Sequence, residues 1–204
     1  MSKIKFFIQQ SWLLIVSSFA FGLLIAVTNA ALIDRINENE ANKTSDKLRI
    51  LLPDAKEILK QESITIKSPQ QSDVNIELYK AITGDQCQGW VFKISGKGFA
   101  DVITLMVGVD KNFEKMIGFS VLSSSETPGF GDRIAGSYYR NQFVGAPVGK
   151  LNLKKTGDPD IIDSDIVAIS GATISSSAVV NMINDTMLQL KTKMLEKGMI
   201  QDVQ

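Results

Sequence analysis

The N-terminal part of the chain contains a long run without charge. No residue between Lys5 and Asp34 is charged, and most side chains in that interval are apolar. A helix of roughly 20 predominantly apolar residues is long enough to cross a bilayer. The run therefore predicts a transmembrane anchor within residues 1–34.

The charges around this run predict its orientation. Lys3 and Lys5 precede it, whereas the stretch that begins at Asp34 is mixed in charge. Because basic flanks stay in the cytoplasm, we expect a single-pass protein of the cytoplasmic (inner) membrane with a cytoplasmic N-terminus and an extracytoplasmic domain. A cleaved signal peptide is the alternative, since residues 28–30 end in small side chains. Its apolar core is only about 7–15 residues long, and the run here continues through Ile33, which favours a retained anchor.

Composition limits the function classes. The chain has 204 residues, and the part after the anchor is long enough for one domain with a sizeable core. Its 22 basic and 22 acidic side chains give a formal net charge of zero, which argues against a nucleic-acid partner. The absence of histidine excludes serine–histidine catalysis and histidine-ligated zinc. The single cysteine, Cys87, cannot form an internal disulfide and is expected to be a partly buried thiol. We predict neither a catalytic residue nor a metal site.

The apolar pattern changes after the anchor. Residues 35–60 contain spaced leucine and isoleucine with Pro53 between them, which predicts a helical stalk followed by a short second helix. Short β-rich runs then predict a sheet within a domain at residues 61–204. The connections look too short for helical crossovers, so we expect a largely antiparallel sheet with flanking helices, an α+β fold. The runs are residues 64–66, 74–79, 91–94, 102–109 and 116–122.

A helix with one apolar face is predicted near the C-terminus. Starting with Ile174, apolar residues recur at helical spacing: Ala178, Val179, Met182, Ile183, Met187 and Leu190. Small residues precede it, and serines and a threonine crowd its first turn. Free N–H groups and the positive end of the helix dipole favour a phosphate at such a turn. A serine-rich helix cap without a ligand is the alternative.

Two motifs resemble those of the FMN-binding domain family. Ser-Gly-Ala-Thr at residues 170–173 is similar to the family's attachment motif, in which the threonine carries FMN through a phosphoester bond. Glu-Thr-Pro-Gly-Phe-Gly at residues 126–131, preceded by Gly-Phe-Ser-Val-Leu at 118–122, is similar to a second motif that lies several tens of residues earlier. Two motifs in the family's order are more specific than one. The two motifs most resemble those of the G subunits of Rnf-type ion-translocating ferredoxin:NAD oxidoreductases. The related C subunits of sodium-translocating NADH:quinone reductases, which are usually longer, come second.

The resemblance implies the binding residues. Thr173 would carry covalent FMN, attached by a separate flavin transferase, and N–H groups around Ser175 and Ser176 would donate to its phosphate. The loop at residues 127–131 would lie against the ring or ribityl chain. Glu126 either satisfies local N–H groups or hydrogen-bonds the flavin. The implied set is Ser170, Gly171, Ala172, Thr173, Ser175, Ser176, Glu126, Thr127, Pro128, Gly129, Phe130 and Gly131.

Two further positions bear on this resemblance. Residues 134–143 are expected to form a helix or turn whose aromatic side chains, Tyr138, Tyr139 and Phe143, belong to the core more often than to a flavin stack. Relatives commonly carry an aspartate six residues before the modified threonine, as part of what the transferase recognises. Here that residue is Val167, with Asp165 and Asp163 out of register. The departure bears on modification and leaves the expected fold unchanged.

The resemblance implies a redox relay, not an enzyme with its own substrate. The flavin would pass electrons between other membrane subunits of an Rnf-type complex, and those subunits would move the ion because one helix does not form a transport pathway. Two alternatives stay open, a stand-alone anchored flavin reductase and a non-redox anchored binding module.

Overall fold

The computed structural model describes residues 3–67, 73–84 and 86–200. This part of the chain divides into two compact units, with the boundary after Lys43. Helix α1, Lys3–Leu51, forms the first unit and continues into the second. Its portion Gln10–Leu51 contains an 18-residue window of mean hydropathy 2.1, none of it buried in the protein. By length and composition this helix can cross a membrane.

The end of α1 differs from the expected stalk. The helix continues to Leu51, and Pro53 follows its end. The residues beyond Pro53 do not form the expected second helix: they form strand β1, Glu57–Lys60, which pairs with another strand of the sheet. That interpretation was wrong because four residues cannot display a helical period, so tertiary pairing decides their conformation.

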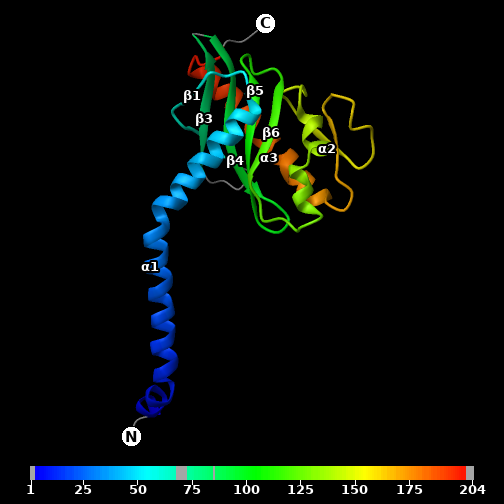
Figure 1. The fold of residues 1–204 in the computed structure, drawn as a ribbon. Helices are drawn as coiled ribbons and strands as arrows, with labels where there is room; N and C mark the ends of the chain where they lie inside the picture. Colours follow the sequence, from blue (N-terminus) through cyan, green and yellow to red (C-terminus); the bar gives the residue numbers. More distant parts are fainter. Residues whose placement is uncertain (1–2, 68–72, 85, 201–204) are drawn as a thin grey trace. The chain divides into compact units, whose positions relative to one another are not determined.

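The second unit is built on an antiparallel sheet, as expected. Its strands follow the order β1-β3-β4-β5-β6, while β2 pairs with β3 beside β1 (Figure 1). All five predicted β-runs are confirmed as strands. After β1 the strands are β2 Ile64–Lys67, β3 Asp73–Thr83, β4 Gln86–Lys97, β5 Val102–Asp110 and β6 Met116–Ser123.

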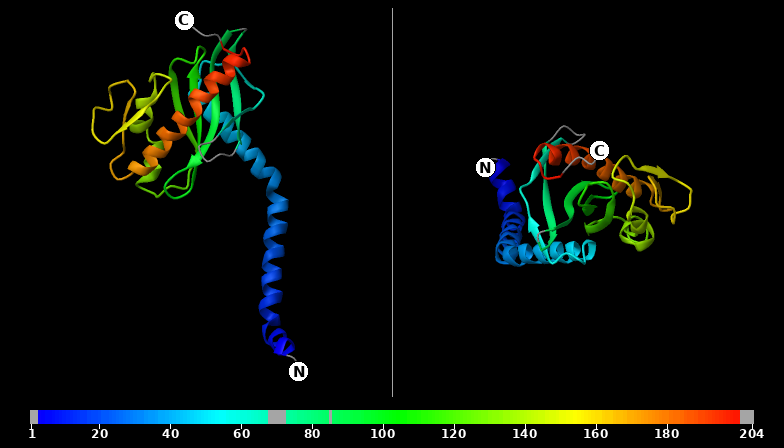
Figure 2. Two further views of the ribbon diagram at one scale, coloured as in Figure 1. Left: turned by 180° about the vertical axis from the view of Figure 1, so that it is seen from behind. Right: turned by 90° about the horizontal axis from the view of Figure 1, so that it is seen from above.

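The two faces of the sheet pack against different helical segments. Helix α3, Thr173–Glu196, lies along one face, where it can be followed in orange and red in Figure 2. Its residues Val179, Ile183 and Leu190 are at most 1% exposed and share the main core with alternate residues of the central strands. Leu48 and Leu51 of α1 cover the opposite face. Because successive side chains of a strand point to opposite faces, burial of both faces goes with apolar residues at nearly every position, as in β5.

A compact segment connects β6 to α3. It contains η1 Gly131–Ala135, α2 Ser137–Arg140, η2 Asn141–Phe143 and the short parallel pair β7 Asn152–Lys154 and β8 Asp165–Val167. The predicted helix or turn at residues 134–143 is therefore confirmed.

The aromatic residues of this segment mostly belong to the core. Tyr139 and Phe143 are fully buried and pack edge-on against Phe119. The Tyr139 hydroxyl donates to the Ser176 carbonyl at 2.9 Å, which ties this segment to α3. Tyr138 is 59% exposed and lies outside that core. Burial of Tyr139 and Phe143 means that neither can stack on a ligand.

Candidate functional site

The turn before α3 is shaped by a glycine. Gly171 has φ +81°, a conformation that residues with a side chain rarely adopt. A Cβ at this position would also lie 3.3 Å from Cδ1 of Phe130, so the turn approaches the residue 126–131 loop closely. The turn leaves Thr173 exposed at the first position of α3. Its hydroxyl is therefore accessible at the start of a helix 24 residues long.

The two serines of the first turn face inward. Ser175 is 2% exposed and Ser176 fully buried. Ser176 Oγ donates to the Ala172 carbonyl at 2.9 Å and accepts from the Ile169 N–H at 3.1 Å. The residue at the N-cap is Ala172, and it forms no side-chain cap. These serines therefore fasten α3 to its surroundings and do not cap it.

Backbone hydrogen bonding distinguishes the Ser176 N–H from the other N–H groups of the first turn. The Ser176 N–H donates to the Ala172 carbonyl at 2.9 Å, as expected for the fourth residue of a helix. The N–H groups of Thr173, Ile174 and Ser175 precede it and belong to the first turn, which lacks intrahelical acceptors. The anion-attracting end of α3 is thus formed by residues 173–175.

The loop at residues 126–131 turns back toward α3. The Phe130 N–H donates to the Thr127 carbonyl at 3.2 Å, and Gly129 has φ +79°. This hydrogen bond closes a turn over residues 127–130, and the third residue of such a turn, here Gly129, needs a positive φ that glycine adopts readily. Phe130 remains 56% exposed beside Gly171. The two motifs, separated along the chain, thus meet through the Phe130 ring.

A pocket of about 430 Å³ lies where these segments meet. Seven of the expected residues line it: Thr127, Phe130, Gly131, Gly171, Ala172, Thr173 and Ser175. Phe99, 59% exposed, and Ile174, 58% exposed, complete the lining. The other five expected residues do not line it: Ser170, Glu126, Pro128, Gly129 and Ser176.

Sequence reasoning missed two of the lining residues for identifiable reasons. The helical spacing predicts Ile174 at the head of the apolar face, but Ile174 is exposed, whereas Ala178 and the later members of that face are buried. Ile174 lies in the first turn of α3, where no preceding turn of the helix continues the buried face. Phe99 follows Gly98 between two strands, and an aromatic residue in such a turn was the available signal.

Glu126 is buried behind the pocket wall. It is 5% exposed and accepts hydrogen bonds from the Ala100 N–H at 2.9 Å and from the Ser175 hydroxyl. Burial alone would raise the pKa of Glu126, but the hydrogen bonds from Ser175 and from the β4–β5 turn outweigh it and lower that pKa. Glu126 is therefore an anion at neutral pH. Of the two roles considered, the contacts match satisfaction of local N–H groups.

Comparison with known proteins places the chain in a family. Residues 98–187, which include both motifs, match the FMN-binding domain family. The G subunit of an ion-translocating oxidoreductase complex from Methanosarcina acetivorans is 30% identical over 84% of this chain and 87% of its own length. The chain belongs to this family of G subunits. A G subunit of a proton-translocating ferredoxin:NAD(+) oxidoreductase complex from Clostridium ljungdahlii is 26% identical, over 88% of this chain and 89% of the relative.

Solved structures support the fold of the chain. The crystal structure of NqrC from Shewanella oneidensis superposes with a TM-score of 0.57 over 67% of this chain and 70% of the other, at 22% identity. Identity at that level supports a shared fold. The α+β arrangement deduced from the sequence is thereby confirmed.

The pocket beside Thr173 fits flavin mononucleotide chemically. Phe99 and Phe130 offer exposed aromatic surface to a flat ring. The first turn of α3 suits a phosphate, and the Thr173 hydroxyl lies at that turn. A volume of about 430 Å³ lies within the usual range of ligand pockets.

An arginine lies beside the attachment turn. Arg133, in η1, donates from Nη1 to the Ser170 carbonyl at 3.4 Å. Ser170 thus does not form a wall of the pocket. Its carbonyl instead holds the Arg133 guanidinium near the turn. A guanidinium here suits the charge of a phosphate. Neither motif includes Arg133, since it lies after the second motif and 37 residues before Ser170.

Val167 occupies a tightly held position. It is 8% exposed at the end of β8, and its N–H donates to Gln142 Oε1 at 2.7 Å. The Gln142 amide donates in return to the Val167 carbonyl at 3.2 Å. Asp165 shares the same face of β8, because side chains two residues apart in a strand point to the same side. Asp165 is thus an acid on this face of β8, where it pairs with Lys154 at 3.5 Å.

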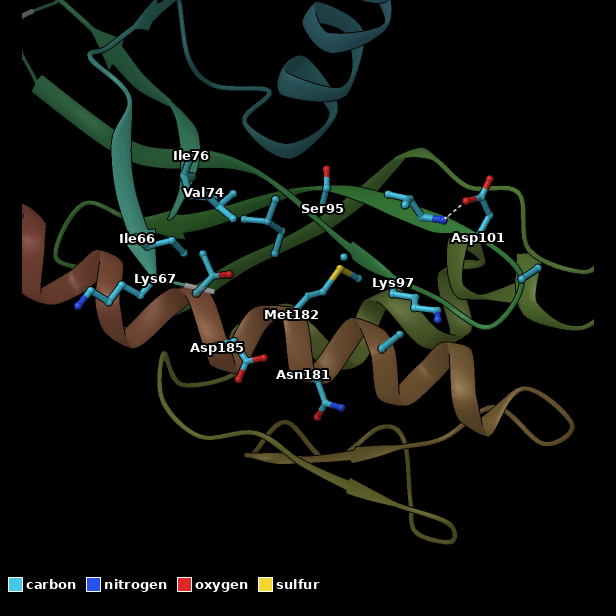
Figure 3. A pocket seen from close by; sticks show the side chains of 16 residues that line it. Ile66, Lys67, Val74, Ile76, Ser95, Lys97, Asp101, Asn181, Met182 and Asp185 are labelled. Atoms are coloured by element: carbon cyan, nitrogen blue, oxygen red, sulfur yellow. Dashed lines mark hydrogen bonds between the residues drawn. The ribbon is translucent and has the colours of Figure 1, made fainter. Parts of the chain in front are cut away.

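A second hollow, of about 630 Å³, lies between α3 and strands β2 to β4 (Figure 3). Met182 of α3 projects toward the strands, and a Cβ at Gly96 would lie 2.5 Å from its sulfur. Its lining includes Ile66, Ile76, Lys97 and Asp185. It contains none of the residues expected to bind flavin, and is therefore separate from the pocket at Thr173.

Proposed function

We propose that this chain carries FMN covalently on Thr173 and relays electrons within an Rnf-type ion-translocating complex. The observation that supports this most directly is the meeting of the two family motifs around one pocket, with the Thr173 hydroxyl exposed at its edge. Membership in the G-subunit family supports the setting, because the relatives are subunits of ion-translocating oxidoreductase complexes.

Each part of the pocket has a proposed role toward FMN. Thr173 supplies the oxygen of the phosphoester, and the N–H groups of residues 173–175 donate to the phosphate. Arg133 balances the remaining negative charge. Phe99 and Phe130 bind the apolar part of the ring, with Thr127 at the same wall. When bound, FMN supplies reversible one-electron redox chemistry.

The attachment also needs a separate protein. A threonine hydroxyl is a weak nucleophile, and a base close to Thr173 would be required for self-attachment. The chain contains no histidine, and the buried carboxylate of Glu126 bonds to Ser175 instead. We therefore propose that a flavin transferase modifies the exposed Thr173, with Asp165 available in place of the expected acid at position 167.

The membrane arrangement is proposed on the charges and the apolar helix. Residues 1–34 serve as a retained single-pass anchor with the N-terminus in the cytoplasm, and the later part of α1 leads to an extracytoplasmic domain that already includes strand β1 and so begins before residue 61. The long apolar part of α1 supports the anchor. A covalent tether is useful outside the cytoplasm, where a dissociated flavin would be lost.

The test is the intact mass of the denatured protein after expression with a flavin transferase. We expect an added FMN less one water, and its absence in T173A. T192A is a matched control, because Thr192 is an exposed threonine of the same helix that does not line the pocket, and its loss should leave the added mass intact. V167D should raise the modified fraction if the shifted acid limits recognition.

Three results would contradict this proposal. An unmodified wild type beside a modified control substrate would remove the covalent link. Wild-type protein without any bound flavin would favour a non-redox binding module. Flavin-loaded protein that copurifies with no other membrane subunit would favour a stand-alone reductase.

A further inference from the structure

No cation in the described part of the chain pairs with the buried anion Glu126. It is the only charged side chain among the buried residues in the described part of the chain. None of the ion pairs formed by described residues includes it. Isolating a charge from water is unfavourable unless other groups stabilise it. All its partners here are neutral donors, so a net negative charge remains inside the domain.

This carboxylate links three segments that form the pocket. Oε1 accepts from the N–H groups of Ala100 and Asp101, at 2.9 and 3.5 Å, in the turn that presents Phe99. Oε2 accepts from Ser175 in the first turn of α3. Glu126 itself begins the loop that carries Thr127 and Phe130. One side chain therefore sets the relative positions of all three walls.

Two glycines leave the space that the carboxylate fills. A Cβ at Gly98 would overlap Glu126 Oε1, and a Cβ at Gly131 would lie 2.8 Å from Oε2. Neither position tolerates a side chain while the carboxylate stays where it is. The fit shows that the backbone of the β4–β5 turn and of η1 is built around Glu126.

A neutral glutamine could form much of this network. Its carbonyl oxygen would accept from the turn, and its amide would donate to the Ser175 hydroxyl, which can rotate to accept. The hydrogen bonds alone therefore do not require a charge. The charge has a further consequence, since an anion beside the pocket disfavours the addition of negative charge to a bound group.

We propose that Glu126 is a positioning residue for the flavin pocket, and that its charge also lowers the reduction potential of the flavin held there. Its hydrogen bonds hold the three walls in place, and its charge acts across the wall through Ser175 and Gly131. The second statement rests on the proposed function; the first concerns the protein before any flavin is bound.

The experiment uses the full-length chain in detergent and compares wild type, E126Q and E126A. Before loading, hydrogen exchange of residues 98–101 should be roughly tenfold faster in E126A and close to wild type in E126Q. After loading with FMN, a spectroelectrochemical titration should give E126Q a more positive midpoint potential than wild type. E62Q is the charge-matched control, because Glu62 pairs with Lys197 beyond the far end of α3.

Each arm can fail separately. Unchanged exchange in E126A would overturn the positioning role. Equal potentials in wild type, E126Q and E62Q would overturn the effect of the charge. If wild type takes up no FMN, the proposed function fails, and the exchange of E126A against E126Q still decides whether Glu126 positions the walls.

Discussion

Glu77 and Glu126 hold a negative charge in two different ways. Glu77, on β3, is 32% exposed and is bonded by Lys60 at 2.8 Å and Lys93 at 3.3 Å. The Lys60 contact is the largest cause that lowers the pKa of Glu77 from 4.5 to about 2. Glu126 is 5% exposed, and only neutral donors bond to it. Cations stabilise one anion, and backbone and hydroxyl dipoles stabilise the other.

This difference distinguishes Glu77, whose charge has a structural role, from Glu126, whose charge lies beside the candidate site. Around Glu77 two lysines more than offset the negative charge on the sheet, and that network contributes modestly to stability, as partly exposed ion pairs do. Around Glu126 the same sign of charge is kept beside the pocket without a counterion among the residues that the structure describes. An uncompensated buried charge that persists in a fold suggests a role in the neighbouring site.

The largest expected effect comes from removing each carboxylate in turn. E126A should lower the free energy of unfolding by about 3 kcal/mol, because it leaves the Ala100 N–H and the Ser175 hydroxyl buried without an acceptor. E77A should cost only about 1 kcal/mol, since Lys60 and Lys93 can turn to water. Chemical unfolding of the full-length protein measures both values. Equal losses would mean that burial does not distinguish the two sites.

Acid should destabilise the fold through both carboxylates, because the fold lowers the pKa of Glu77 and that of Glu126. Because the folded pKa of Glu77 is lowered from 4.5 to about 2, its contribution is present above pH 4.5 and is lost as the pH falls toward 2. E77Q should therefore reduce the loss of stability between these pH values by about 1 kcal/mol, after allowance for solvent screening. Thermal unfolding across that range is the measurement. If stability fell with pH in E77Q as it does in wild type, the pairing of Glu77 with Lys60 would be excluded as a cause of the acid sensitivity.

Salt gives the smallest and most selective difference. The Debye length falls from about 10 Å at 0.1 M salt to about 3 Å at 1 M, so partly exposed ion pairs weaken while buried contacts do not. The destabilisation caused by E77Q should shrink by a few tenths of a kcal/mol in 1 M NaCl, whereas that caused by E126Q should stay constant. Salt dependence of E126Q equal to that of E77Q would contradict the burial of Glu126.

Local patterns predicted the regular elements because they act over short distances. Alternating and β-branched residues indicated the five strands from Ile64 to Ser123, and spaced apolar residues from Ala178 to Leu190 indicated α3. The exception was β1 after Pro53. Its four residues pair with the end of β3, a partner that local periodicity does not encode.

The candidate site was predictable in part. Motifs indicated the two segments around Thr173 and Phe130, since both types of turn need glycine and both motifs resemble a known family. They did not predict Phe99 in the wall, nor that Ser175 and Ser176 point inward. The inward position of Ser175 depends on its bond to Glu126, 49 residues away along the chain.

The sequence alone determined the apolar N-terminal run, the strands and α3, and the two motifs that signal the family. Each of these depends on residue type and spacing within a few turns or strands. Only the tertiary structure decided that Glu126 lies behind the pocket wall, that Arg133 reaches Ser170, and that Ile174 is exposed. Such features follow from packing among distant segments, because burial and hydrogen-bond partners are properties of the assembled core and not of a residue's sequence neighbours.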